Sequence, residues 1–203
     1  MSERTLSKHF LHQFVNTIAR ELGQDNLSIV LEKAGLPSDW SDPVRWESLT
    51  RTTPIEAYAG LQKAMRTYYG RGARGILIRV GSNLWKRLLD DAPLALKAQS
   101  RLLFGLPLNA RRKSALELLA KLLGDKRGDV TVHTLDLDLL LVDTTSPSTL
   151  GQNEPECICY VTLGLLRECL YWGTGREHGI EETSCRAKGD EACELEVSVG
   201  GQL

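Results

Sequence analysis

The chain has 203 residues, with 25 lysines and arginines against 26 aspartates and glutamates, and 42% of its residues are hydrophobic. This composition is typical of a globular protein that folds unaided, and it argues against a disordered chain. A net charge of −1 gives no bulk attraction to nucleic acid, and no apolar run approaches the roughly 20 residues of a membrane span. Because Met1 to His9 contain no apolar signal segment, we expect a cytosolic protein.

The first part of the chain has helical periodicity. Apolar residues recur every three or four positions from Leu6 to Leu22, with Thr5 as the expected N-cap and Gly23 as the end, and a shorter helix follows. Prolines, serines and threonines over residues 37–54 are typical of a loop. Further helices are predicted over residues 54–68, 76–88, 94–104 and 109–123.

Three glycines, Gly70, Gly72 and Gly75, form the pattern GxGxxG between two of these helices. In dinucleotide-binding proteins this pattern follows a strand and opens a helix. Here the preceding segment has helical periodicity, so the sequence does not favour a dinucleotide site.

After Gly128 the apolar period changes to two. Two strands are predicted within residues 130–141, then a helix over 159–172, then strands over 180–186 and 192–199 joined by a turn. Helices followed by an antiparallel sheet with one further helix predict an α+β fold.

All five cysteines lie between Cys157 and Cys193. An odd number of cysteines in a chain expected to be cytosolic argues against a disulfide framework and favours metal or thiol chemistry. Cys185 and Cys193 fall on consecutive strands across a tight turn, where their side chains can lie side by side. Glu182 would point to the opposite face by simple alternation, and a β-bulge would bring it to the same face.

A fourth metal ligand has three candidate donors in the sequence. Cys159 lies at the start of the preceding helix, and Cys157 and His178 compete with it. Zinc accepts thiolates, imidazole and a carboxylate in tetrahedral geometry. Residue spacing alone also allows Cys185 and Cys193 to be small buried side chains or a disulfide.

The segment from Glu182 to Cys193 resembles the C-terminal signature of the 4-vinyl reductase domain family, small-molecule-binding modules also called hydrocarbon-binding proteins. Their fold relatives include phenol-sensing domains of transcription activators, TRAPP tethering subunits and haem-nitric-oxide-binding domains. The zinc ligands of the phenol sensors are Cys, Glu, Cys and Cys at intervals of 23, 3 and 8, and Cys159, Glu182, Cys185 and Cys193 have the same intervals. The resemblance therefore implies a structural zinc site at these four residues.

The resemblance also implies a helical leader over residues 1–50 and a ligand-binding domain over residues 51–203. The family's ligand chamber lies between the sheet and the helices that cover it. Its expected lining residues here are Trp85, Phe104, Leu139, Leu141, Tyr160, Leu163 and Tyr171.

Three functions are compatible with this resemblance. The first is a homodimeric sensor or carrier of a small hydrophobic molecule, either aromatic, lipid or tetrapyrrole. The second is an accessory or carrier protein of bacteriochlorophyll biosynthesis that handles a vinyl tetrapyrrole. The third is a dimeric interaction protein like the tethering subunits. Without a nicotinamide or flavin fingerprint, autonomous catalysis is not expected, and the Tyr-x-Ser-x-Arg pattern of the haem-binding relatives is missing.

Overall fold

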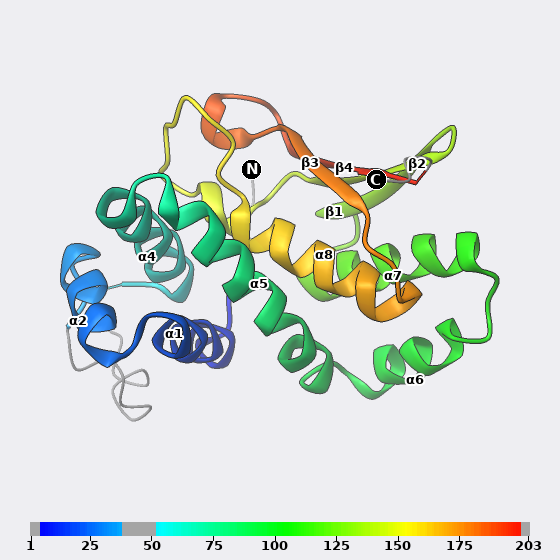
Figure 1. The fold of residues 1–203 in the computed structure, drawn as a ribbon, viewed down its shortest axis with the longest axis horizontal. Helices are drawn as coiled ribbons and strands as arrows, with labels where there is room; N and C mark the ends of the chain where they lie inside the picture. The colour runs from blue at the N-terminus through cyan, green and yellow to red at the C-terminus, as the bar shows by residue number, and fades with distance from the viewer. Residues whose placement is uncertain (1–4, 38–51, 200–203) are drawn as a thin grey trace.

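The computed structural model describes residues 5–37 and 52–199, which fold into seven α-helices and a four-stranded sheet (Figure 1). This arrangement confirms the predicted α+β class. Most of the predicted loop over residues 37–54 lies outside the described residues. The helices are α1 (Lys8–Leu22), α2 (Gln24–Lys33), α4 (Pro54–Tyr69), α5 (Gly72–Asp90), α6 (Leu94–Leu103), α7 (Leu108–Leu123) and α8 (Tyr160–Thr174).

Helices α1 and α4 begin with side-chain caps. Helix α4 begins with a capping box, in which Thr53 and Glu56 satisfy each other's backbone N–H groups, and Pro54 occupies the first turn. The prediction that Thr5 caps α1 is wrong, because Ser7 accepts the hydrogen bond from the Phe10 N–H. Thr5 instead donates its N–H and its hydroxyl to Asp125, 120 positions away.

The sheet is antiparallel throughout, in the order β1-β2-β4-β3. Helix α8 connects its two hairpins, and Figure 1 shows α7 and α8 on the same side of the sheet. Along β4, buried and partly exposed residues alternate, as expected of a strand with one face against a core. The strands are β1 (Val130–Leu135), β2 (Asp138–Asp143), β3 (Gly179–Ser184) and β4 (Cys193–Ser198).

Helices α5 and α8 cross at two glycines with their backbones in contact. A Cβ atom at Gly81 would lie 2.1 Å from the Val161 carbonyl oxygen, and one at Gly164 would lie 2.0 Å from the Ile78 carbonyl oxygen. Ser82 donates a hydrogen bond to the Gly164 carbonyl at the same crossing. The position of α8, and of the residues that precede it, therefore depends on this close approach.

One hydrophobic core unites both halves of the described chain. Phe14 of α1 and Leu31 of α2 belong to the same buried cluster as Trp85 of α5, Leu166 of α8 and Leu195 of β4. The division of the chain at residue 50 stays a prediction. None of the helices in the described ranges is both long and apolar enough to cross a lipid bilayer.

Candidate metal centre and ligand cavity

A small buried cluster gathers four metal-ligating side chains at the end of the β3–β4 hairpin. Cys159 immediately precedes α8, Glu182 lies on β3, Cys185 follows β3, and Cys193 begins β4. One potential ligand atom from each lies within 4.8 Å of the others. The structure thus brings together the four residues whose spacing matches the zinc ligands of the phenol sensors.

A β-bulge in β3 brings Glu182 to this cluster. Glu182 pairs with Leu195 and Ser184 pairs with Glu194, so β3 has one more residue than its partner between these pairs. A bulge of this kind changes the side-chain alternation, which would otherwise place Glu182 and Cys185 on opposite faces. The Glu182 Oε2 accepts a hydrogen bond of 2.9 Å from the Cys159 N–H, which joins β3 to the start of α8.

The sulfur positions match a tetrahedral metal. The Cys159 Sγ lies 3.4 Å from the Cys193 Sγ and 4.0 Å from the Cys185 Sγ, and all three cysteines are free. With zinc–sulfur bonds of about 2.3 Å, tetrahedral geometry places sulfurs about 3.8 Å apart. The two distances lie on either side of that value.

The neighbouring backbone and side chains support thiolates in this cluster. The Arg186 N–H donates to the Cys193 Sγ at 3.4 Å, and the Ser146 hydroxyl lies 3.5 Å from the Cys159 Sγ. Asp190 accepts a 2.8 Å hydrogen bond from the Cys185 N–H and so fixes the turn between the strands. Such outer contacts orient ligands and are typical of metal sites.

The cluster retains protons in the absence of a cation. Burial raises the pKa of Glu182 to about 8, and its Oε1 is buried with no hydrogen-bond partner among the described residues. Hydrogen bonds with Cys185 and Cys193, followed by burial, raise the pKa of Cys159, whereas hydrogen bonds from Cys159 and Cys193 lower that of Cys185. A divalent cation would displace the retained protons and coordinate the orphan carboxylate oxygen, so the donor set fits a zinc ion.

The other candidate donors lie elsewhere. Cys157 packs at the edge of the cluster, and burial raises its pKa to about 11. His178 accepts a hydrogen bond of 3.0 Å from Arg112 Nε, and Cys169 donates to the Ala115 carbonyl inside the main core. His178 and Cys169 thus have other hydrogen-bond partners and Cys157 lies at the edge, so none of the three belongs to the four-residue set.

The seven predicted lining residues have different surroundings. Leu139, Leu141 and Leu163 are packed in the core, and Trp85 is 2% exposed with its ring 5.4 Å from that of Trp172. Three of the residues reach the surface: Tyr160 partly, and Phe104 and Tyr171 about half. Their role as a ligand chamber stays a prediction.

A cavity of about 330 Å³ lies instead between α1, the ends of α5 and α7, and the start of α8, and we call it the α1–α5 cavity. The apolar periodicity of α1 and α5 predicts that these helix faces are buried in a core, and nothing in it indicates a cavity between them. Its wall is mainly apolar and includes Leu6, Phe10, Tyr58, Leu84, Leu88, Ala92, Leu122, Leu123 and Leu165.

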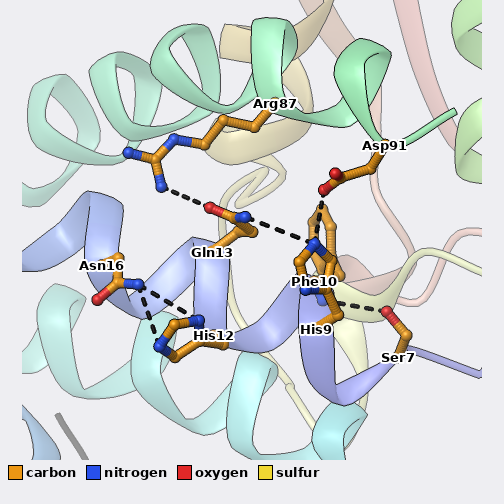
Figure 2. A network of polar contacts seen from close by, with 8 residues as sticks. All are labelled: Ser7, His9, Phe10, His12, Gln13, Asn16, Arg87 and Asp91. Carbon is orange, nitrogen blue, oxygen red and sulfur yellow. Dashed lines mark hydrogen bonds and ion pairs between the residues drawn. The ribbon is translucent and has the colours of Figure 1, made fainter. Parts of the chain in front are cut away.

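Polar side chains also line this cavity, and Figure 2 shows the contacts among several of them. Arg87 donates a hydrogen bond of 2.6 Å to the side-chain amide oxygen Oε1 of Gln13, and His9 Nε2 lies 2.7 Å from an Asp91 carboxylate oxygen (Figure 2). The Gln13 amide nitrogen lies 3.5 Å from His9 and so keeps donor capacity next to the cavity. An apolar cavity with a few polar groups is typical of small-molecule sites.

Comparison with known proteins gives a fold relationship only. No family model and no curated protein matches the chain. An H-NOX protein from S. oneidensis in the Fe(II)NO state is 11% identical over 97% of this chain and 100% of its own, with a TM-score of 0.57. An H-NOX mutant from T. tengcongensis is 14% identical over 98% of this chain and 100% of its own, with a TM-score of 0.56.

A third similar structure is a subunit of a trafficking protein particle complex. The trafficking protein particle complex subunit 3 from Naegleria fowleri, covalently bound to palmitic acid, is 21% identical over 73% of this chain and 94% of its own, with a TM-score of 0.51. The predicted fold relationship to both groups is confirmed. Membership of the 4-vinyl reductase family stays a prediction.

Haem, which is named for an H-NOX neighbour, does not fit the histidines of this chain. His9 contacts Asp91, His12 contacts Asn16, His133 contacts Thr131, and His178 contacts Arg112. Of the four, only His9 lines the α1–α5 cavity, and its side chain is 61% exposed and held by a carboxylate. No histidine is therefore placed as an axial ligand inside an enclosed apolar cavity.

Proposed function

We propose that the chain is a small-ligand-binding domain, acting as a sensor or carrier, with a structural zinc ion bound by Cys159, Glu182, Cys185 and Cys193. The observation that carries the metal assignment is the convergence of three free thiols and an orphan carboxylate oxygen within 4.8 Å. Four protein ligands leave no open position for a substrate, which favours a structural role over a catalytic one.

Bound zinc would supply two positive charges to the buried cluster and link three chain segments. The protein residues supply everything else in this arrangement. The bulge presents Glu182, the Arg186 N–H and the Ser146 hydroxyl contact the sulfurs, and the helix crossing sets the position of Cys159. The β3–β4 hairpin and α8 would then move as one unit, and α8 also contributes Thr162 and Leu165 to the wall of the α1–α5 cavity.

The α1–α5 cavity is the ligand site that the geometry supports best. Its volume of about 330 Å³ and mainly apolar wall suit a small hydrophobic molecule, and Gln13 offers a hydrogen bond to a single polar group. The fold neighbours include a protein with bound palmitic acid and haem proteins. An acyl chain or aromatic molecule fits this wall, whereas the histidine arrangement disfavours haem.

Two measurements on protein purified from its own host test this proposal. We expect metal analysis to find about one zinc per chain, in line with one closed four-ligand site. Native mass spectrometry should find a retained hydrophobic ligand. A metal-free protein that is fully folded would overturn the zinc site, and a protein that retains no organic molecule would count against the carrier role.

A matched pair of variants locates the ligand. Ala92 lies in the wall of the α1–α5 cavity, whereas Ala95 is exposed on α6. Ala92→Phe should reduce the retained ligand by filling the cavity, and Ala95→Phe should leave it unchanged. Equal retention in both variants would show that the ligand does not bind in this cavity, and would favour the predicted chamber at Leu139, Leu141 and Leu163.

A further inference from the structure

A second cavity, of about 450 Å³, lies at the junction of α4, α5 and the segment that leads to Cys159. It is separate from the α1–α5 cavity and shares no lining residue with it. Three of its nine lining residues are arginines, so we call it the arginine pocket. The lining residues are Arg66, Gly70, Arg71, Arg74, Glu154, Pro155, Glu156, Ile158 and Tyr160.

Arg66 is the most buried of the three arginines and is only partly satisfied. Its Nη2 donates to Gln152 at 2.9 Å and to Glu154 at 3.1 Å. The side chain is only 12% exposed, and its Nε and Nη1 are buried with no hydrogen-bond partner among the described residues. A buried charged donor without an acceptor is costly. An additional hydrogen-bond acceptor beside Arg66 would therefore be favourable, because the described part of the chain supplies none for these two nitrogens.

Arg71 and Arg74 add positive charge that no carboxylate of the described chain neutralises. Both are exposed, and neither takes part in a hydrogen bond or ion pair within residues 5–37 and 52–199. They lie at the start of α5, whose first turn contains no acidic residue and has no side-chain cap. The free N–H groups of such a 19-residue helix add partial positive charge at the same place.

The glycine motif keeps this helix start open. Gly70 has φ of 53° and ψ of −129°, a conformation that favours glycine, and it turns the chain between α4 and α5. A Cβ atom at Gly70 or Gly72 would meet no atom within 4 Å, so these positions leave the backbone uncovered. The motif thus follows a helix, as predicted. Because these glycines have no side chains, a ligand can reach the backbone of the first turn of α5.

Two glutamates line the same pocket and set its charge. Glu154 is paired with Arg66, and Glu156 lines the same pocket as Arg71 and Arg74 without an ion pair to either within the described residues. The lining therefore keeps a positive balance of one formal charge, three arginines minus two glutamates, in addition to the helix terminus.

We propose that the arginine pocket binds a phosphate group. A phosphate presents three oxygens in different directions, which suits donors that come from Arg66, from the turn and from the first turn of α5. A carboxylate is less suitable, because its two oxygens lie in one plane and Glu154 already occupies one edge of Arg66. The phosphate could belong to free inorganic phosphate, to a nucleotide or to a lipid headgroup, since all three present the same chemistry.

Calorimetric titration of the zinc-loaded full chain tests this site at constant ionic strength. The probes are inorganic phosphate, adenosine monophosphate, and phosphatidylcholine vesicles with and without phosphatidic acid. The test variant is Arg71→Gln/Arg74→Gln, in which both changed residues are exposed, so folding should persist. The charge control is Arg101→Gln, an exposed arginine on α6.

We expect at least one phosphate probe to bind, and its dissociation constant to rise about tenfold or more in the double variant and not in Arg101→Gln. Binding of one probe alone identifies the source of the phosphate group. The proposal is overturned if no probe binds, if the double variant binds as well as the parent, or if sulfate and chloride compete equally well. None of these results depends on the hydrophobic ligand.

Discussion

The two buried clusters of this protein differ in what holds them together. The main cluster unites the helices and the sheet and contains large side chains such as Phe14, Trp85 and Leu116. The small cluster at the end of the β3–β4 hairpin consists of Ile158, Cys159, Cys185, Ala187 and Cys193. Only one of these five, Ile158, has a large aliphatic side chain, so burial at about 25 cal/mol per Å² stabilises the small cluster far less.

This difference explains why a metal would be placed at one end of the molecule. The main cluster can be stabilised by apolar burial and close helix packing alone. The hairpin end has little apolar area and contains Glu182, whose buried oxygen lacks a partner. We therefore expect changes at the cysteines and changes at the helix crossing to damage different parts of the fold.

Removal of the metal should have the largest effect. Cys193→Ser leaves an incomplete ligand set, so we expect loss of the zinc and about 5 kcal/mol or more of stability. This corresponds to a fall in melting temperature of about 10–20 °C for a chain of this size. Metal analysis and calorimetry measure both quantities.

Cys157→Ser is the matched control for this prediction. Cys157 lies next to the cluster but outside the four-residue set. The variant should keep about one zinc per chain, as one closed site requires. Loss of zinc from Cys157→Ser, with zinc retained in Cys193→Ser, would show that a different set of thiols binds the metal.

The next largest effect is expected at the crossing of α5 and α8, which belongs to the main cluster. In Gly164→Ala the new Cβ would lie 2.0 Å from the Ile78 carbonyl oxygen, so the helices must separate. We expect a loss of about 3 kcal/mol or more. Gly75→Ala on α5 is the control, because its Cβ would lie 3.7 Å from a flexible arginine side chain. Chemical denaturation of the two variants measures the difference.

Much of the fold follows from local sequence patterns, and the exceptions have tertiary causes. The predicted helix over residues 94–104 corresponds to α6 (Leu94–Leu103), because its period and the flanking prolines are local signals. The prediction that Thr5 caps α1 is wrong because Asp125, remote in sequence, binds the Thr5 hydroxyl. Local capping preferences do not include hydrogen-bond partners that only the tertiary fold brings close.

The candidate sites were predictable to different degrees. Residue patterns alone suggested a bulge near Glu182 but left Cys159, Cys157 and His178 open as donors. Which of them meets Cys193 depends on where α8 lies, and that is set by a helix crossing rather than by any local signal. The α1–α5 cavity was missed because an apolar helix face looks the same whether its neighbours fill the space beside it or leave a gap.

A smaller effect should come from the serine beside the sulfurs. The Ser146 hydroxyl lies 3.5 Å from the Cys159 Sγ, and contacts of this kind typically change metal affinity by about 10–100-fold. Ser146→Ala should therefore weaken zinc binding within this range, measured by competition with a chelator. Ser148→Ala is the control, because the Ser148 hydroxyl is also buried but has no hydrogen-bond partner. Equal zinc affinity in the two variants would exclude a role for the Ser146 contact.

The smallest effect concerns pH and lies away from the hairpin end, where Arg112 of α7 meets His178. Burial, followed by the charge of Arg112, lowers the pKa of His178, whose neutral form accepts the Arg112 hydrogen bond at Nε2. The folded protein therefore binds fewer protons at this site than the unfolded chain. The resulting stability is present above the unfolded pKa of about 6.5 and is lost as the pH falls through the lower folded value.

In His178→Gln this loss should be absent, so the variant's melting temperature should fall less steeply than the parent's below pH 6.5. The pKa of His12 is also lowered and is common to both proteins, so only the difference between the two pH profiles reports on His178. Parallel profiles would show that the pKa of His178 is not lowered in the folded protein.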